Sequence, residues 1–220
     1  MKVRVKNMRI HFWALCVAVV VVCSACAATE LEERCFPILV SVGLEDGKVA
    51  YALGFPKEGI AGEENKTTKA NVMTVKQKDF KESKMKYESR MNKLVDYNHL
   101  KVIVLEEDFV KQIQLYEEML DYLAQTEEFP RNTYVCAVDD VEELMEIETD
   151  LSQELGTYLE EYLNKNENAK GDILTLGDLM DEKENKKMVL YIPYLEVEDS
   201  YVEWDGYYAV GMGLPPVRIQ

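Results

Sequence analysis

Histidine is scarce in this sequence, and its scarcity removes several classes of metal site and enzyme. Of the two histidines in 220 residues, only His99 lies outside the N-terminal apolar segment. From Cys26 onward, the sequence contains no C-x-x-C or H-E-x-x-H spacing, which common zinc sites use. It also contains no G-x-S-x-G turn, Walker loop or recognisable Cys–His nucleophile motif. We therefore predict a protein with no catalytic residues, no metal and no cofactor.

Basic residues are few relative to acidic ones. Lys and Arg number 25, against 41 Asp and Glu, which gives a formal net charge of −16 at pH 7. A domain this acidic repels nucleic-acid phosphates and anionic lipid headgroups. This excludes nucleic-acid binding, and attachment to a membrane has to come from an anchor rather than from the folded surface.

The N-terminus has the layout of a secretory signal. Residues 2–9 carry four basic side chains and no acid, residues 10–22 are almost wholly apolar, and small residues surround Cys26. This predicts a signal peptide over residues 1–25, cleaved before Cys26, whose sulfur is then acylated (palmitate) as in bacterial lipoproteins. The alternative is an uncleaved anchor helix, because the apolar stretch is near the lower limit for crossing a bilayer. Both alternatives tether the rest of the chain on the extracytoplasmic face of a membrane.

Cleavage would leave residues 26–220 with three cysteines and a net charge of 21 − 41 = −20. If Cys26 is acylated, Cys35 and Cys136 remain as a candidate disulfide in an oxidising compartment. The alternative, which we favour, is two buried thiols acting as small hydrophobes, since each lies beside a strand-like run.

Strand-like and helix-like patterns alternate along residues 26–220, which have the length of one ordinary domain. The β-rich runs 36–44 and 49–55 flank Asp46-Gly47, a strong hairpin signal. Further strands are expected at residues 70–75, 100–105, 133–138, 188–197 and 202–210, and helices at 79–95, 109–123, 151–163 and 175–182, with one more helix opened by Asp139-Asp140 and a loop at 57–69. Alternating elements in the middle predict parallel strands. The expected fold is α+β (mixed α/β), a mixed β-sheet with flanking helices and hairpins at both ends.

Four carboxylates near the C-terminus are candidates for acid–base work on sugars. They are Glu196, Glu198, Glu203 and Asp205. Two suitably spaced carboxylates would be enough to hydrolyse a glycosidic bond. Acids at alternate strand positions are more commonly a solvated face, and that is our interpretation.

His99 stands directly before the buried strand expected at residues 100–105. An imidazole there can cap a chain end or form a hydrogen bond with a neighbouring carbonyl, which would stabilise the turn into the strand. A catalytic role would require a partner side chain and an open cleft, and the sequence indicates neither. We predict a structural role for His99.

Residues 97–110, YNHLKVIVLEEDFV, resemble the N-H-L-K-x-hydrophobic signature of the Ger(x)C family of spore-germination lipoproteins. Residues 129–135, FPRNTYV, are similar to that family's Pro-Arg-Asn segment. Residues 32–46 and 204–210 match its first strand and its Asp-Gly strand in the same order. The motif residues are Asn98, His99, Leu100, Lys101, Pro130, Arg131, Asn132, Asp205 and Gly206. We interpret them as residues that define the fold first and form a contact surface second.

The resemblance implies a protein that is not an enzyme. Members of the family are the C subunits of nutrient germinant receptors, lie on the outer face of the spore inner membrane and assemble with two integral membrane subunits. The expected function is therefore a membrane-tethered assembly module acting in spore germination. The alternative is an extracellular ligand-binding lipoprotein or a carboxylate hydrolase of the cell wall.

Two departures limit the resemblance. Family members continue with a further domain of comparable size, and residues 26–220 match only the N-terminal one. The Cys-Trp-Asp-type sequence common after the lipid-bearing cysteine is here Cys26-Ala27-Ala28-Thr29. We therefore expect a single domain over residues 26–220, similar to the family's N-terminal domain.

Overall fold

The computed structural model describes residues 33–56, 73–149, 151–170, 173–185, 189–211 and 214–219. Cys35–Gln220 forms one compact unit, and Met1–Arg34 is a separate one. The predicted signal peptide, Cys26 and the loop expected at 57–69 lie outside the described residues. Within the described part of the chain, no helix has the length and apolar character needed to cross a membrane.

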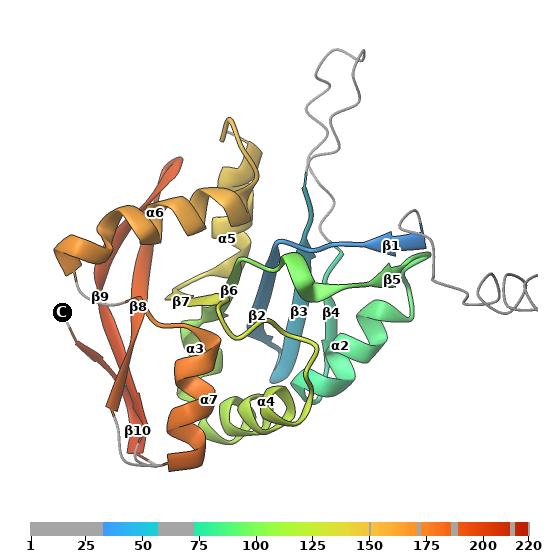
Figure 1. Cartoon of the computed structure of the whole chain (residues 1–220), viewed down its shortest axis with the longest axis horizontal. Coiled ribbons are helices and arrows are strands. Elements are labelled where there is room, and N and C mark those ends of the chain that lie inside the picture. The colour runs from blue at the N-terminus through green and yellow to red at the C-terminus, as the bar shows by residue number, and fades with distance from the viewer. Residues whose placement is uncertain are drawn as a thin grey trace, which may run out of the picture. The chain divides into compact units, whose positions relative to one another are not determined.

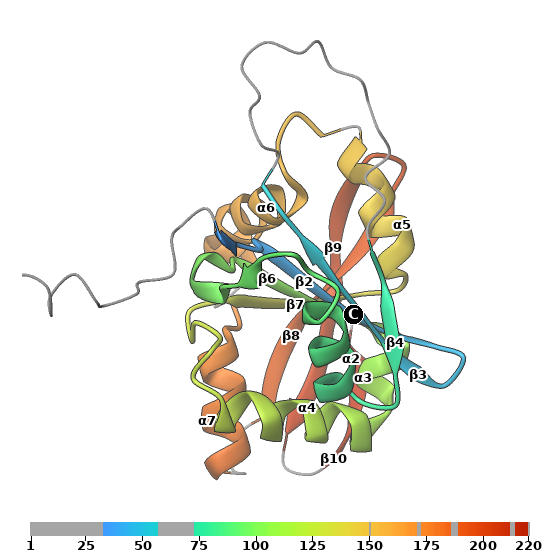
Figure 2. The same cartoon turned by 90° about the vertical axis from the view of Figure 1, so that its right-hand side faces the viewer.

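One eight-stranded mixed sheet organises the domain, as Figures 1 and 2 show. Its spatial order is β10 (Leu214–Ile219), β9 (Tyr201–Gly211), β8 (Val189–Glu198), β7 (Tyr134–Val138), β6 (Val102–Glu106), β2 (Leu39–Glu45), β3 (Lys48–Gly54) and β4 (Val75–Gln77). The four central strands are parallel, and the strands beyond them on both sides are antiparallel. A separate two-stranded sheet pairs β1 (Arg34–Cys35) with β5 (Leu94–Val95). The predicted mixed sheet with hairpins at both ends is confirmed.

Helices cover both faces of this sheet (Figure 1). The α-helices are α2 (Phe80–Glu88), α3 (Glu107–Lys111), α4 (Ile113–Gln125), α5 (Val141–Glu146), α6 (Leu155–Lys170) and α7 (Leu176–Asn185), and the 3₁₀-helices are η2 (Tyr97–His99) and η3 (Ile147–Thr149). Residues of α5 and α6 pack on one face against Val102 and Val104. Residues of α2, α4 and α7 pack on the other face against Ile103 and Leu105. β6 is apolar at consecutive positions because both of its faces are buried.

The β2–β3 hairpin follows from its turn residues. Asp46 and Gly47 both have positive φ angles, 52° and 71°. A two-residue loop with φ > 0 at both positions matches the twist of the flanking strands, and Asp-Gly accepts that geometry at low cost. The hairpin predicted at this position is confirmed.

Several sequence expectations differ from the structure: the strand expected at residues 70–75 is β4 at Val75–Gln77, and the helix expected at residues 151–163 begins only at Leu155. The helix predicted over residues 79–95 begins correctly, with Asp79 as its N-cap, but ends at Glu88, after which residues 94–95 form β5. The helix predicted over residues 109–123 is interrupted at Gln112, whose φ and ψ of −83° and 78° are not helical. β10 was not predicted from the sequence, in which the last expected strand is 202–210.

Candidate functional site

The family signature segments meet at the amino ends of β6 and β7. The ring of Tyr97, in η2, stacks on Phe129 with centroids 4.4 Å apart. The Thr133 hydroxyl donates to the carbonyl of Leu100 at 3.3 Å. One residue further along both segments, the Tyr134 amide donates to the Lys101 carbonyl at 2.9 Å. Segments about 30 residues apart in the chain are therefore joined by their own signature residues.

A buried lysine lies against the aromatic pair of Tyr97 and Phe129. The side chain of Lys84, in α2, is only 3% exposed, and its ammonium lies 2.8 Å from Glu88 and 2.6 Å from Glu128. It also lies 5.1 Å from the Tyr97 ring centroid and 5.9 Å from that of Phe129. Burial opposes the charge, but the hydrogen bonds to Glu128 and Glu88 outweigh it, so the pKa of Lys84 is raised. We call Lys84, Glu88, Tyr97, Phe129 and Glu128 the lysine cluster.

Two tyrosine hydroxyls extend the lysine cluster into the core. The hydroxyls of Tyr51 and Tyr97 lie 2.9 Å apart, and that of Tyr97 donates to Glu88 at 2.9 Å. Burial raises the pKa of both tyrosines well above the ordinary value. Both phenols therefore stay protonated, as structural hydrogen-bond donors and acceptors.

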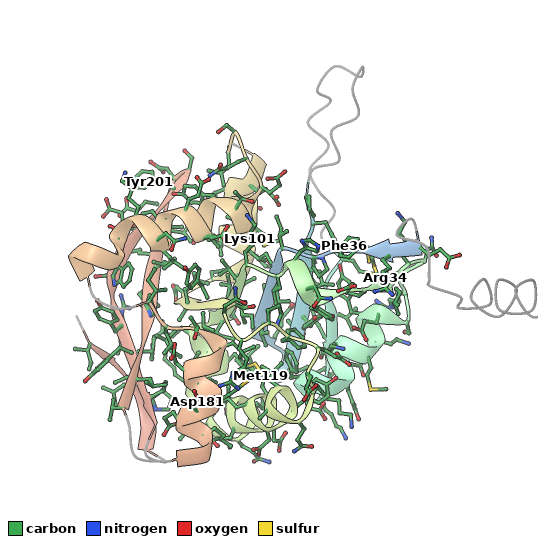
Figure 3. The ribbon with its side chains drawn as sticks, in the orientation of Figure 1. Arg34, Phe36, Lys101, Met119, Asp181 and Tyr201 are labelled. Carbon is green, nitrogen blue, oxygen red and sulfur yellow. The ribbon has the colours of Figure 1, made fainter. Side chains whose placement is uncertain are left out.

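Lys101 and Arg131, the two basic residues of the motif, reach across to helices on opposite faces of the sheet. Lys101 contacts Glu160 at 2.7 Å and Thr157 at 3.2 Å, both on α6. The Arg131 guanidinium contacts Asp181, on α7, at 2.6 Å. Figure 3 marks Lys101 beside α6 and Asp181 on α7. Both motif cations thus connect strand ends to helices within the domain.

The polar residues of the motif lie at the surface. Asn98 and His99 are exposed, and the Asn98 amide donates to Asp96, the N-cap of η2, at 2.7 Å. The His99 imidazole meets the edge of the Phe36 ring, with centroids 4.9 Å apart. Pro130 accepts a hydrogen bond from the Thr133 amide at 3.2 Å, and Asn132 is exposed. His99 thus makes an aromatic contact at the turn where a hydrogen bond to a carbonyl was expected.

Asp205-Gly206 forms a β-bulge in the C-terminal strands. Tyr207 pairs with Pro193 and Trp204 with Leu195, so that Asp205 and Gly206 together oppose the single residue Tyr194. Gly206 has a φ of 90°, which a residue with a side chain rarely adopts. The bulge also positions Asp205 for an ion pair with Arg218 of β10.

The carboxyl end of β6 carries two acidic residues that were not among the candidate site residues from the sequence. Glu106 accepts a hydrogen bond from the Leu44 amide at 2.6 Å, and burial raises its pKa. A Cβ on Gly43 would lie 2.8 Å from the Glu106 carboxylate, so the glycine makes room for this contact. Glu107 accepts from Tyr208 and contacts Lys111 at 2.7 Å. The Glu106 contact joins β6 to β2 and the Tyr208 contact joins α3 to β9, and no sequence spacing signals either.

The candidate disulfide is not present. Cys35 and Cys136 are both free thiols. Cys136 belongs to β7 in the centre of the large sheet, where burial raises its pKa to about 12, whereas Cys35 lies in β1 of the small sheet. The two cysteines belong to different sheets, and each thiol stays separate.

The four C-terminal carboxylates lie on a strand surface. Glu196 pairs directly with Glu203 across β8 and β9, Glu198 pairs with Tyr201, and Asp205 is bound by Arg218. Glu196, Glu198 and Glu203 are exposed. Within the described ranges, no group of three or more His, Cys, Asp or Glu residues could hold a metal ion. The arrangement of these carboxylates gives the hydrolase alternative no support.

Comparison with known proteins adds to this geometry. The family model described as "Spore germination protein N-terminal domain" matches residues 27–197. The chain belongs to this family. The predicted resemblance to spore-germination proteins is thereby confirmed, and the matched range ends one residue before the end of β8.

One solved structure is similar to the chain. It is described as "Crystal Structure of the GerBC protein" and is 14% identical, with 81% of this chain and 51% of that chain covered and a TM-score of 0.38. The present chain therefore spans about half the length of that protein. No curated protein sequence matches the chain.

Proposed function

We propose that this chain acts in spore germination as the N-terminal domain of a germinant-receptor C subunit, where it is a membrane-tethered assembly module and not an enzyme. The observation that carries the proposal is the family match over residues 27–197, which includes the lysine cluster and six of the eight strands of the large sheet.

The ion pairs of the motif's basic residues support a role without catalysis. Lys101 and Arg131 form ion pairs with Glu160 and Asp181 on two different helices. They do not converge on one point where a substrate would be held, as an active site requires. The motif residues serve to hold the amino ends of the strands against α6 and α7, which gives a rigid platform for assembly.

Tethering is proposed through Cys26, in the signal layout of residues 1–28. The acidic surface, with a net charge of −16, favours an anchor over direct adsorption to anionic lipid. In a Cys26→Ala variant we expect the acyl mass to disappear and the protein to leave the membrane fraction. Membrane retention without acyl mass would instead support the uncleaved anchor helix. Cys35→Ala is the matched control and should change neither result.

The proposed partners are the integral membrane subunits of the receptor, with the domain on the outer face of the spore inner membrane. The test is a mild-detergent pull-down of the tagged full chain from sporulating cells, with partners identified by mass spectrometry. Co-purification of those subunits is the expected result. A preparation that lacks them at native abundance would contradict the proposal, and Phe129→Ala, which disrupts the lysine cluster, should lose them.

A further inference from the structure

An uncharged apolar face lies on the outer half of the three-stranded ribbon formed by β8, β9 and β10. Residues opposite each other on antiparallel strands point to the same side. Tyr191 pairs with Ala209, which pairs with Val217. The next pairs on the same side join Pro193 to Tyr207 and Tyr207 to Ile219. We call the side chains of Val189, Tyr191, Pro193, Tyr207, Ala209, Val217 and Ile219 the ribbon face.

Four of the seven side chains of the ribbon face are open to solvent, whereas Tyr207 and Ala209 are half-buried and Pro193 is buried. The exposed fraction is 50% for Tyr191, 58% for Val217, 42% for Ile219 and 39% for Val189. None of its seven residues is Asp, Glu, Lys or Arg, although such residues make up 30% of the chain. An uncharged apolar patch with four exposed side chains, on a strongly charged protein, is a candidate binding surface.

The other half of the same side of the ribbon shows what covers such a face in this fold. There, Leu195 and Val202 are buried against Leu159 and Leu163 of α6. Figure 1 shows α6 lying across one end of β8 and β9, while no helix lies on that side of the ribbon at the end near β10. The boundary falls between Trp204 and Tyr207, whose ring centroids are 5.5 Å apart. An amphipathic helix completes one half of the ribbon, and the equivalent position on the other half is vacant among the described residues.

The dimensions of the ribbon face suit one helix. Three strands spaced about 4.8 Å apart span about 10 Å, and the residues from Val189 to Pro193 span about 13 Å. A helix about 10 Å wide covers that length with about nine residues, or two to three turns. A stable dimer of whole domains buries about 800 Å² on each partner, which is more than a face of this size offers.

Charge and strand chemistry select among occupants. A second copy of the chain and an anionic bilayer would both be repelled by the net charge of −16. Addition of a strand to the edge of β10 is disfavoured because Pro215 and Pro216 have no amide hydrogen to donate. We propose that the ribbon face binds an amphipathic helix of a partner protein, apolar on the side that contacts the ribbon and neutral or basic on the other. The proposal stands on the ribbon face alone and does not depend on the receptor assignment.

The test uses the full-length ¹⁵N-labelled protein and three synthetic 14-residue peptides. The first has leucines on one helical face and lysines on the other, the second has the same composition in scrambled order, and the third has glutamate in place of lysine. We expect the first peptide to shift the amide resonances of β8, β9 and β10, and the other two to bind at least tenfold more weakly. Val217→Asp should weaken the first peptide at least tenfold. Leu94→Asp, at a position 56% exposed on β5, is the matched control and should leave binding unchanged.

Four outcomes would overturn the proposal. The first is the absence of shifts at peptide concentrations up to about 1 mM, where even weak complexes form. The second is equal binding of the scrambled peptide. The third is self-association that Val217→Asp abolishes, and the fourth is binding to phosphatidylglycerol vesicles that Val217→Asp abolishes. The third result would assign the face to a second copy, and the fourth to a lipid surface. Ile219→Asp, near the end of β10, replaces Val217→Asp if the latter alters the amide spectrum of β6 or β7. A failed receptor pull-down would leave these results unaffected.

Discussion

The lysine cluster and the ribbon face use large apolar and aromatic side chains in opposite ways. In the lysine cluster, the rings of Tyr97 and Phe129 are buried together and enclose an ion pair. On the ribbon face, Tyr191 and Val217 are at least half exposed. The ribbon is also joined to β7 through only two residue pairs, one of them Val138 with Leu195. The most recognisable residues of this family therefore secure the domain, whereas the surface best suited to a partner lies where those signatures are sparse.

The largest expected effect comes from the lysine cluster. Phe129→Ala should lower the free energy of unfolding by about 3–5 kcal/mol, because it removes a fully packed ring and leaves a cavity beside Lys84. Urea unfolding monitored by circular dichroism measures this change. Leu94→Ala removes an exposed apolar side chain and should stay within about 0.5 kcal/mol. Equal effects of the two variants would contradict the view that the lysine cluster secures the domain.

Gly206→Ala tests whether the ribbon opens separately from the rest of the sheet. At a φ of 90° a side chain is strained, and the expected loss is about 1–2 kcal/mol. Hydrogen exchange should become faster in β8 and β9 and stay unchanged in β6, because the ribbon is joined to the sheet at so few positions. Gly206→Asn, which tolerates positive φ better, should recover part of the loss. Uniform acceleration across the sheet would show that the ribbon and the core open together.

Arg218→Ala tests how firmly β10 is held to the ribbon. The Arg218 guanidinium lies 3.9 Å from the centre of the Tyr194 ring and pairs with Asp205. Because the side chains of the ion pair are about one-third exposed, we expect a loss of about 1 kcal/mol or less. A double-mutant cycle with Asp205→Asn in low and high salt separates the two contributions. A coupling that high salt does not reduce would contradict a screened surface pair.

His99→Ala should have the smallest effect. The imidazole is exposed and meets only the edge of the Phe36 ring among the contacts described, so the expected loss is about 0.5 kcal/mol. Thermal unfolding measures it, with His99→Phe as the conservative variant that retains the edge contact. A loss as large as that of Phe129→Ala would show that this signature histidine is a main structural support.

Much of the fold could be predicted because local chemistry determined it. Asp46-Gly47 selects the hairpin turn, Asp79 and Asp140 cap helices through their side chains, and the apolar run before Glu106 indicates a strand covered on both faces. Family resemblance also identified which segments matter, but it could not show that Tyr97 stacks on Phe129. That contact depends on the path of the chain through α3 and α4.

Other features escaped prediction because tertiary contacts overrode the local pattern. The amphipathic stripe continues through Gln112, yet the helix breaks there, and nothing in the spacing signals it. β10 contains two prolines and forms only because it is an edge strand, where missing amide donors are tolerated. The burial of Lys84 could not be predicted from the sequence, because its partner Glu128 lies 44 residues away in the chain. The ribbon face appears only once the register of three strands is known.

The burial of Lys84 has a consequence for how this protein is turned over. A protease that cleaves after lysine must draw several residues around its target into an extended conformation, and here those residues are helical and the side chain is enclosed by rings and carboxylates. Cleavage at this position therefore requires α2 to leave the domain first. The amount of a fragment that ends at Lys84 would therefore measure how many molecules had already released α2 from the domain. Cleavage of this one peptide bond thus reports domain integrity in living cells.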